Sequence, residues 1–330
     1  MTPIADAPQH APGPEAVMAR AGGENFPVAS RVLPRRARSH LLAIYGFARL
    51  VDELGDDGPP GARLAALDWL EGELDRALSG RAQHPLLLRL AASARACSLP
   101  REPFVRLIEA NRTDQRVSRY QTWEQLRGYC ALSADPVGEL VLGVFAAATP
   151  ARVALSSSIC TALQLTEHCQ DVAEDYARGR VYLPAEDLRR FGCSERELAL
   201  EHASAPLRQV LAFEVARARR LLADGAPLIA TLRGRPKLAV AAFLAGGRAA
   251  LDAIERARYD VLAGPPRAGS ARRAGALIAT LRAAGRAGAD SCAWTGTDAG
   301  AGADISAARD AGAGADISAV RDAGGGGGGG

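Results

Sequence analysis

The sequence lacks the features that mark disulfide-rich, zinc-binding or membrane-spanning proteins. Its six cysteines show no C-x-x-C pair and no Cys/His ligand spacing, so we interpret them as small apolar core residues in a reducing compartment. No window approaches the roughly 18 uninterrupted apolar residues of a spanning helix. The N-terminus has no charged start followed by an apolar run, which is the pattern of a signal peptide. We therefore expect a cytoplasmic protein.

Aromatic residues and lysine are also scarce. Aromatics make up 5% of the 330 residues, and Lys237 is the only lysine, so almost every basic side chain is arginine. A formal net charge of +3 over this length is too weak to predict nucleic-acid binding, and few aromatics are present for base stacking. A moderately basic chain instead suits an anionic small molecule or an acidic membrane surface. The arginine bias has two interpretations, which are genomic base composition and the match of guanidinium groups to phosphate oxygens.

Both ends of the chain differ in composition from its middle. Residues 1–22 are rich in proline, and we expect them to be disordered. Residues 291–330 contain two copies of an Asp/Ala/Gly-rich repeat followed by a run of glycines, which predicts a disordered tail. The middle, residues 23–290, is rich in Ala, Leu, Arg and Glu, and its apolar residues recur at spacings of three and four. This pattern predicts a single all-α domain.

Residues 41–57 carry ionisable side chains on one face of a predicted helix. At about 100° per residue, Tyr45, Arg49, Asp52 and Asp56 fall within about 60° of one another, and the residues between them are mostly apolar. Burying carboxylates is unfavourable unless they are paired or bind a metal. Two interpretations are open for this helix alone: a buried ligand-binding face, or a solvated face with an i,i+3 Arg–Asp pair.

A second segment, residues 159–182, repeats the pattern. The same spacing predicts one polar helical face, with Asp175 at its edge, made of Gln164, Glu167, Asp171, Glu174 and Arg178. We expect His168 to lie off this face, as a surface or core histidine. Two helices that each present carboxylates four residues apart can face each other across a cavity, and such oxygen ligands suit Mg²⁺. The arrangement would neutralise a diphosphate and stabilise it as a leaving group.

Four motifs in order extend this pattern to a known family. The two aspartate motifs read Tyr45-x3-Arg49-x2-Asp52-x3-Asp56 and Gln170-Asp171-x2-Glu174-Asp175-x3-Gly179-Arg180-x-Tyr182-x-Pro184. Two further motifs read ENFPVASR at residues 24–31 and YCALSADPVG at residues 129–138. Together they resemble the squalene/phytoene synthase family of head-to-head prenyl transferases, and the last two resemble its hopanoid-pathway branch, the HpnC type of squalene or hydroxysqualene synthase. The resemblance covers residues 23–290 and implies a catalytic domain with the isoprenoid-synthase fold, a helical bundle around a central cavity.

The resemblance also implies roles for the residues that match its motifs. Catalysis through Mg²⁺–diphosphate binding is implied for Asp52, Asp56, Asp171 and Asp175. Contact with the diphosphate or the prenyl chain is implied for Ser30, Arg31, Tyr45, Arg49, Gln164 and Arg180. Arginine forks pair bidentately with phosphate oxygens, which agrees with the arginines of this set. Three nearby arginines match no contact motif, and they either face an anionic membrane or form a solvated basic surface: Arg35, Arg36 and Arg38.

Three positions depart from the family pattern. Glu167 stands where the family usually has an asparagine that helps to hold a metal, and its carboxylate could ligate Mg²⁺ while adding negative charge. Glu53 follows Asp52, where a second aspartate is common. Leu132 stands where other squalene synthases have a tyrosine tied to the first half-reaction. Because leucine cannot exchange a proton, this position speaks against condensation of two farnesyl diphosphates.

The function implied is Mg²⁺-dependent conversion of presqualene diphosphate to hydroxysqualene, with release of diphosphate. No NADPH is expected, since the chain has no glycine-rich dinucleotide motif. The alternative is a complete synthase that condenses two farnesyl or geranylgeranyl diphosphates to squalene, dehydrosqualene or phytoene. A non-enzymatic helical relative is a third reading, which the retained aspartate pairs count against. The apolar product favours transient contact with the inner membrane surface, where pathway enzymes are potential partners, and no nucleic-acid partner is expected.

Overall fold

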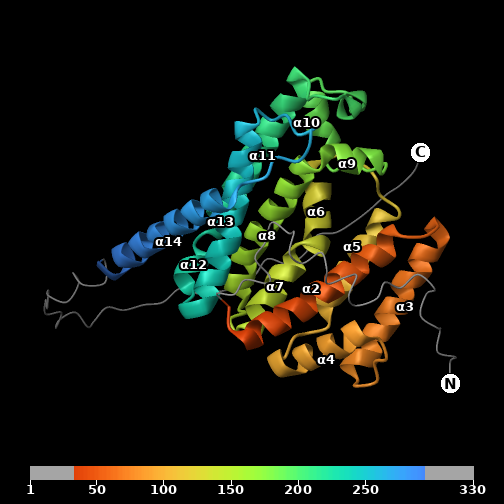
Figure 1. The fold of residues 1–330 in the computed structure, drawn as a ribbon, viewed down its shortest axis with the longest axis vertical. Helices are drawn as coiled ribbons and strands as arrows, with labels where there is room; N and C mark the ends of the chain where they lie inside the picture. The colour runs from red at the N-terminus through yellow and green to blue at the C-terminus, as the bar shows by residue number, and fades with distance from the viewer. Residues whose placement is uncertain (1–32, 294–330) are drawn as a thin grey trace, which may run out of the picture. The chain divides into compact units, whose positions relative to one another are not determined.

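A computed structural model describes residues 33–293, and within this range the chain is helical, with no β-strand. Figure 1 shows the helices, whose bounds are α2 (Arg35–Asp56), α3 (Pro60–Leu78), α4 (Pro85–Cys97), α5 (Glu102–Asp114), α6 (Trp123–Ser133), α7 (Asp135–Val144), α8 (Pro150–Gln170), α9 (Val172–Ala177), α10 (Ala185–Arg190), the 3-10 helix η2 (Glu195–Ala199), α11 (Ala205–Gly225), α12 (Leu228–Thr231), α13 (Gly234–Arg256) and α14 (Ser270–Ala293). The predicted all-α class is confirmed. The segment predicted to be disordered at residues 1–22, and almost all of that at 291–330, lie outside the described residues.

Proline and side-chain caps set several helix boundaries. Pro60 and Pro150 occupy the first turns of α3 and α8, where a helix does not use the backbone N–H that proline lacks. The hydroxyl of Thr149 caps α8 by accepting a hydrogen bond from the backbone N–H of Arg152 at 3.4 Å. These local signals explain why the helices begin where proline interrupts the sequence.

The hydrophobic core has two main parts. One surrounds α8, which packs along α11 and also contacts α7, α6 and α13. Gly225 at the end of α11 allows the close approach to α8, because a Cβ atom there would lie 2.8 Å from the carbonyl oxygen of Leu155. The other part joins α2, α3, α4 and α5, and its fully buried Phe47 and Phe104 rings meet edge to face at 5.3 Å. The two parts together fix α2 and α8 within one helical bundle.

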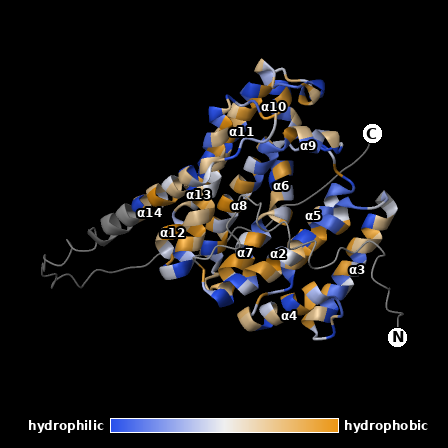
Figure 2. Cartoon of the chain, in the orientation of Figure 1, coloured by the Kyte–Doolittle hydropathy of each residue, from blue (hydrophilic) through white to orange (hydrophobic). Residues whose placement is uncertain are grey.

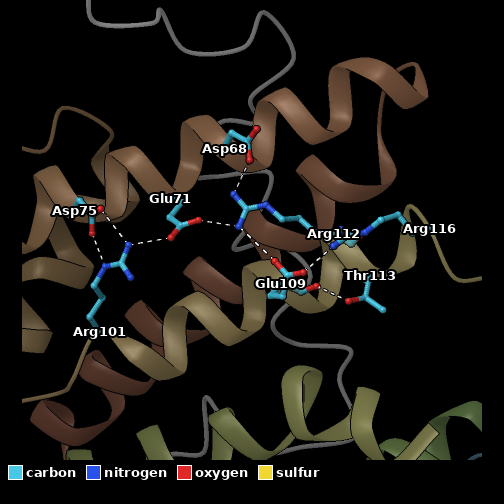
Figure 3. A network of polar contacts seen from close by, with 8 residues as sticks. All are labelled: Asp68, Glu71, Asp75, Arg101, Glu109, Arg112, Thr113 and Arg116. Atoms are coloured by element: carbon cyan, nitrogen blue, oxygen red, sulfur yellow. Dashed lines mark hydrogen bonds and ion pairs between the residues drawn. The ribbon is translucent and has the colours of Figure 1, made fainter. Parts of the chain in front are cut away.

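A network of arginines and carboxylates links α3 to α5 on the surface (Figure 3). Arg112 of α5 donates hydrogen bonds to Asp68 at 2.6 Å and to Glu71 at 2.7 Å. Arg101, just before α5, donates to Glu71 at 2.9 Å and to Asp75. Exposed ion pairs are worth up to about 1 kcal/mol each, so the network aligns the two helices more than it stabilises the fold.

The long helices carry both hydrophobic and hydrophilic residues along their length (Figure 2). This amphipathic pattern is typical of helices that bury one face and leave the other in water. Among the described residues, no helix is both long and apolar enough to cross a membrane.

Candidate active site

The predicted site residues within the described range surround one cavity of about 460 Å³. Its wall is built mainly by α2, α5, α7, α8 and α13, with the segment from α9 to residue 182 closing one end. The predicted residues on this wall are Tyr45, Arg49, Asp52, Asp56, Gln164, Glu167, Asp171, Asp175 and Arg180. Ser30 and Arg31 lie outside the described residues, and their roles stay predictions. The structure thus brings the two aspartate motifs, which are more than a hundred residues apart in sequence, to one place.

Asp52 occupies the middle of the α2 stripe and faces the cavity. Its side chain is 48% exposed because it borders the cavity rather than packing against other atoms. The surrounding protein still shields the carboxyl from bulk water, and this burial raises its pKa to about 6. Arg49, 3.7 Å away on the same helix, and a 3.3 Å hydrogen bond from Asn111 of α5 oppose the rise, whereas Asp56 and Asp114 add to it. The stripe is therefore a sheltered face of ionisable groups rather than a simple solvated face.

Asp56 connects the two motifs directly. Arg180, in the loop after α9, places Nη2 2.9 Å from Asp56 Oδ1, and Arg178 places Nη1 3.9 Å from Asp56 Oδ2. The Arg180 side chain is only 16% exposed, whereas that of Arg178 is 55% exposed. Arg180 is thus held inside the site, where a guanidinium can pair with phosphate oxygens.

The second motif is not the continuous helical face that the sequence predicts. α8 ends at Gln170, Asp171 leaves helical geometry with φ −102° and ψ 19°, and α9 begins at Val172. The backbone hydrogen bonds from Asp171 to Glu167 and from Asp175 to Asp171 persist across the break, at 2.9 and 2.8 Å. The predicted straight helix is therefore wrong at this point, and a kink separates Glu167 from Asp175.

Of the two adjacent carboxylates after this break, Asp175 faces the cavity and Glu174 does not. Asp175 lines the cavity with a 19% exposed side chain, and burial and the neighbouring Asp171 raise its pKa to about 7. Glu174 is 61% exposed and forms an ion pair with Arg178 at 2.8 Å, outside the cavity wall. The prediction that Glu174 shares the polar face while Asp175 lies at its edge is thus reversed.

Sequence reasoning missed a group of polar residues beside the aspartates. Asp114 of α5 accepts hydrogen bonds from the hydroxyls of Tyr129, at 2.7 Å, and Tyr182, at 3.0 Å. Burial raises the pKa of Asp114 to about 6 in spite of these bonds. Asn111 and Asp114 stand three residues apart on an otherwise apolar helix face, and this spacing was the signal that could have identified α5 as a third polar wall.

His168 is buried, as one of its two predicted alternatives states, but it also lines the cavity. Its ring stacks on that of Tyr182 with centroids 3.9 Å apart, and burial lowers its pKa to about 3. The core alternative is therefore confirmed, and the place of His168 on the cavity wall is an addition that the sequence did not indicate. A neutral imidazole at this position contributes an aromatic wall rather than a charge.

Away from the aspartates the cavity becomes apolar. Its lining there includes Leu41, Ile44, Val137, Val141, Leu163 and Phe243. Leu132 is not part of the lining and instead packs, partly buried, against the α8 core. The cavity thus has one charged end and one hydrophobic body, which suits a molecule with an anionic head and a hydrocarbon chain.

The donor set at the charged end fits Mg²⁺. Carboxylate oxygens are its preferred protein ligands, and it usually takes one or two of them with water and phosphate oxygens completing the shell. Burial is the main cause of the raised pKa values of Asp52 and Asp175, and a bound cation would favour the ionised form of both carboxyls. Across residues 33–293 no three His, Cys, Asp or Glu side chains are gathered closely enough to enclose a metal.

Comparison with known proteins agrees with this geometry. The profile of the squalene/phytoene synthase family matches residues 19–274. A hydroxysqualene synthase from Rhodopseudomonas palustris is 36% identical over 216 residues, which are 64% of this chain and 72% of that protein. The crystal structure of squalene synthase HpnC from Alicyclobacillus acidocaldarius is 44% identical, has a TM-score of 0.68, and covers 75% of this chain and 92% of its own.

A more distant structure confirms the fold. A dehydrosqualene synthase solved with a ligand superimposes with a TM-score of 0.72 at 23% identity, over 83% of this chain and 95% of its own. The helical bundle around a central cavity is therefore the isoprenoid-synthase fold, as the sequence predicts. The chain belongs to the squalene/phytoene synthase family, whose members are enzymes that act on prenyl diphosphates.

Proposed function

We propose that this enzyme converts presqualene diphosphate to hydroxysqualene and diphosphate, with Mg²⁺ as its cofactor. The observation that carries the proposal is the pairing of two aspartate motifs at one end of an otherwise apolar cavity. The similarity to a hydroxysqualene synthase over most of the folded chain supports this choice of reaction within the family.

The charged end would bind and activate the diphosphate. Asp52 and Asp56 on one side, and Asp171 and Asp175 on the other, would hold Mg²⁺, with Glu167 within the same wall. When bound, the metal supplies positive charge to the departing diphosphate. Arg180 would donate hydrogen bonds to the same oxygens from its sheltered position.

The apolar body would control the carbocation that remains. When the C–O bond breaks, its electron pair leaves with diphosphate, and the cyclopropylcarbinyl cation rearranges within the cavity. A single water then attacks the cation and loses a proton, which yields the alcohol without a reductant. The side chains of Leu41, Val141 and Phe243 would limit the access of other water molecules.

Condensation of two prenyl diphosphates is a second candidate, because the structure weakens the argument from Leu132. That side chain packs in the core and does not line the cavity, so its identity does not decide which groups reach the substrate. A different tyrosine lines the cavity: Tyr129, whose hydroxyl donates a hydrogen bond to Asp114. The solved relative from Alicyclobacillus acidocaldarius is described as a squalene synthase.

The location of the enzyme follows from the proposed chemistry. The substrate and the product both carry long hydrocarbon chains, and a bilayer is where such molecules accumulate. We therefore place the protein at the membrane surface transiently, as a peripheral protein rather than a spanning one. The enzymes that supply the prenyl diphosphate and consume the product are its expected partners.

A product assay with purified protein and Mg²⁺ tests the proposal. Presqualene diphosphate and farnesyl diphosphate are supplied separately, without NADPH, and the extracted products are identified by mass spectrometry. Hydroxysqualene from presqualene diphosphate alone would establish the second half-reaction. Consumption of farnesyl diphosphate would assign the condensation to this chain, and turnover of neither substrate would refute both candidates.

A further inference from the structure

Six basic residues gather at the N-terminal ends of α2 and α13. We name this group the basic end face, and its members are Arg35, Arg36, Arg38, Arg233, Arg235 and Lys237. No acidic residue occurs in residues 33–51 or 225–251. Among the described residues, none of the six forms an ion pair, and neither does Asp224, the acidic residue that precedes the second stretch. Within residues 33–293, the face is therefore a region of positive charge to which no carboxylate is paired.

Packing between the two helices brings their N-terminal ends together. Leu33 and Leu41, which flank the first three arginines, belong to one buried cluster with Ala239, which lies just after Lys237. Figure 1 shows the start of α2 beside α12 and the start of α13. Arg152 adds a further cation, because it donates a 2.7 Å hydrogen bond to the carbonyl oxygen of Thr231 in α12.

Helix stability does not explain these cations. The positive end of a helix dipole favours acidic residues in the first turn, yet α2 and α13 have none there. Some arginines elsewhere are held by carboxylates, as Arg101 and Arg112 are in Figure 3. The basic end face thus adds two helix N-termini to six unpaired cations, and both contributions attract an extended anion.

The apolar body of the cavity lies directly behind this face. Leu41 and Val141 line the cavity and also belong to the buried cluster beneath the basic residues. Two large apolar side chains are exposed nearby, Leu238 within the face and Val137 on the cavity wall, each at 37%. Basic residues around exposed apolar side chains match a surface of anionic headgroups over hydrocarbon.

We infer that the basic end face docks on the anionic surface of a lipid bilayer and so places the apolar body of the cavity next to the membrane. The use of such docking, transfer of an apolar molecule to or from the bilayer, rests on the proposed function. The charges and exposed side chains that indicate docking do not depend on it. A second copy of the chain fits this face poorly, because it would set arginine against arginine.

Vesicle sedimentation tests the inference with variants that should fold. Arg233→Glu/Arg235→Glu and Arg35→Glu/Arg36→Glu reverse exposed charges in first turns, where glutamate interacts favourably with the helix dipole. The matched control is Arg189→Glu/Arg196→Glu, which changes the net charge equally at exposed positions on α10 and η2. The probe is vesicles of phosphatidylglycerol and phosphatidylcholine, compared with pure phosphatidylcholine, at low and high salt.

We expect the wild-type protein and the control to bind the anionic vesicles in low salt, and each test variant to bind at least about tenfold more weakly. Equal losses in the control and the test variants would overturn the inference, because net charge alone would then explain binding. Wild-type protein that does not bind the anionic vesicles would also overturn it, even if the protein binds a soluble polyanion. So would a change of oligomeric state in the test variants, because the face would then be an interface between copies of the chain. Diphosphate release in detergent, without vesicles, should be unchanged in the test variants, so failure of the proposed reaction is seen separately.

Discussion

Arg180 Nη2 lies 2.9 Å from Asp56 Oδ1, so the end of the second aspartate motif is held against the end of the first. This contact joins residues more than a hundred positions apart in sequence and closes the charged end of the cavity between α2 and the loop after α9. The same guanidinium raises the local positive potential beside Asp114 and Asp175, whose pKa values it lowers against the effect of burial.

The first prediction concerns this arginine. Arg180→Gln should lower kcat/KM by about 10- to 100-fold, since a charge-assisted contact to both Asp56 and the diphosphate is lost. Arg180→Lys should recover part of the loss, because it restores the charge without the fork. Arg178→Gln is the control: its 55% exposed side chain should matter far less, and steady-state kinetics showing equal losses would contradict the assignment.

The second prediction tests the kink at Asp171 with two adjacent carboxylates. Asp175→Asn should reduce turnover at least about 100-fold, because Asp175 faces the cavity. Glu174→Gln should leave turnover close to wild type, because Glu174 is 61% exposed and, among the described residues, pairs with Arg178 alone. Circular dichroism should show equal helix content in both. The opposite order of effects would indicate the straight helix that periodicity alone predicts.

The third prediction concerns the approach of α11 to α8. Gly225→Ala should lower the free energy of unfolding by about 1–3 kcal/mol, since its Cβ would meet the backbone oxygen of Leu155 at 2.8 Å. Gly128→Ala is a matched control at an exposed position of α6, where nothing lies within 4 Å and alanine should add about 0.5–1 kcal/mol. Urea denaturation measures both. A stabilised Gly225→Ala protein would show that the helices are less closely packed.

The fourth prediction concerns a buried cluster in which Arg217 forms ion pairs with two carboxylates. Arg217 contacts Asp187 at 2.9 Å and also Glu214, and burial raises the pKa of the fully buried Glu214 to about 8 from its ordinary 4.5. The folded state therefore binds this proton more tightly than the unfolded chain does. It follows that the stabilisation present below about pH 4.5 is progressively lost as the pH rises toward 8.

Glu214→Gln removes this dependence. The unfolding free energy of the wild-type protein should fall relative to that of the variant between pH 5 and 8, as measured by urea denaturation across that range (about three pH values suffice). Parallel curves for the two proteins would show that Glu214 stays ionised in the folded state. Enzyme activity is a poor readout here, because the cavity aspartates titrate in the same range.

The sequence by itself determined the helical class, the helix boundaries at proline, and the charged stripe of α2. These are local properties: a side chain's place on a helix follows from a period of 3.6 residues, so Tyr45, Arg49, Asp52 and Asp56 share a face wherever the helix goes. The resemblance of its motifs to those of the family added Arg180 to the predicted site and identified the second aspartate motif. The roles of Ser30 and Arg31, and the domain boundaries at residues 23 and 290, stay predictions.

Only the tertiary structure decided which residues meet. The helix break at Asp171 lies inside the second motif; after it Asp175 lines the cavity whereas Glu174 pairs with Arg178 outside the wall, a choice that the spacing of three and four leaves open. Asp114 joins the site because packing of α5 against α2 and α6 brings Tyr129 and Tyr182 to its carboxylate. Leu132 leaves it because its side chain packs into the α8 core. Contacts of this kind depend on burial of helix faces distant in sequence, and that free energy belongs to the whole fold rather than to any segment.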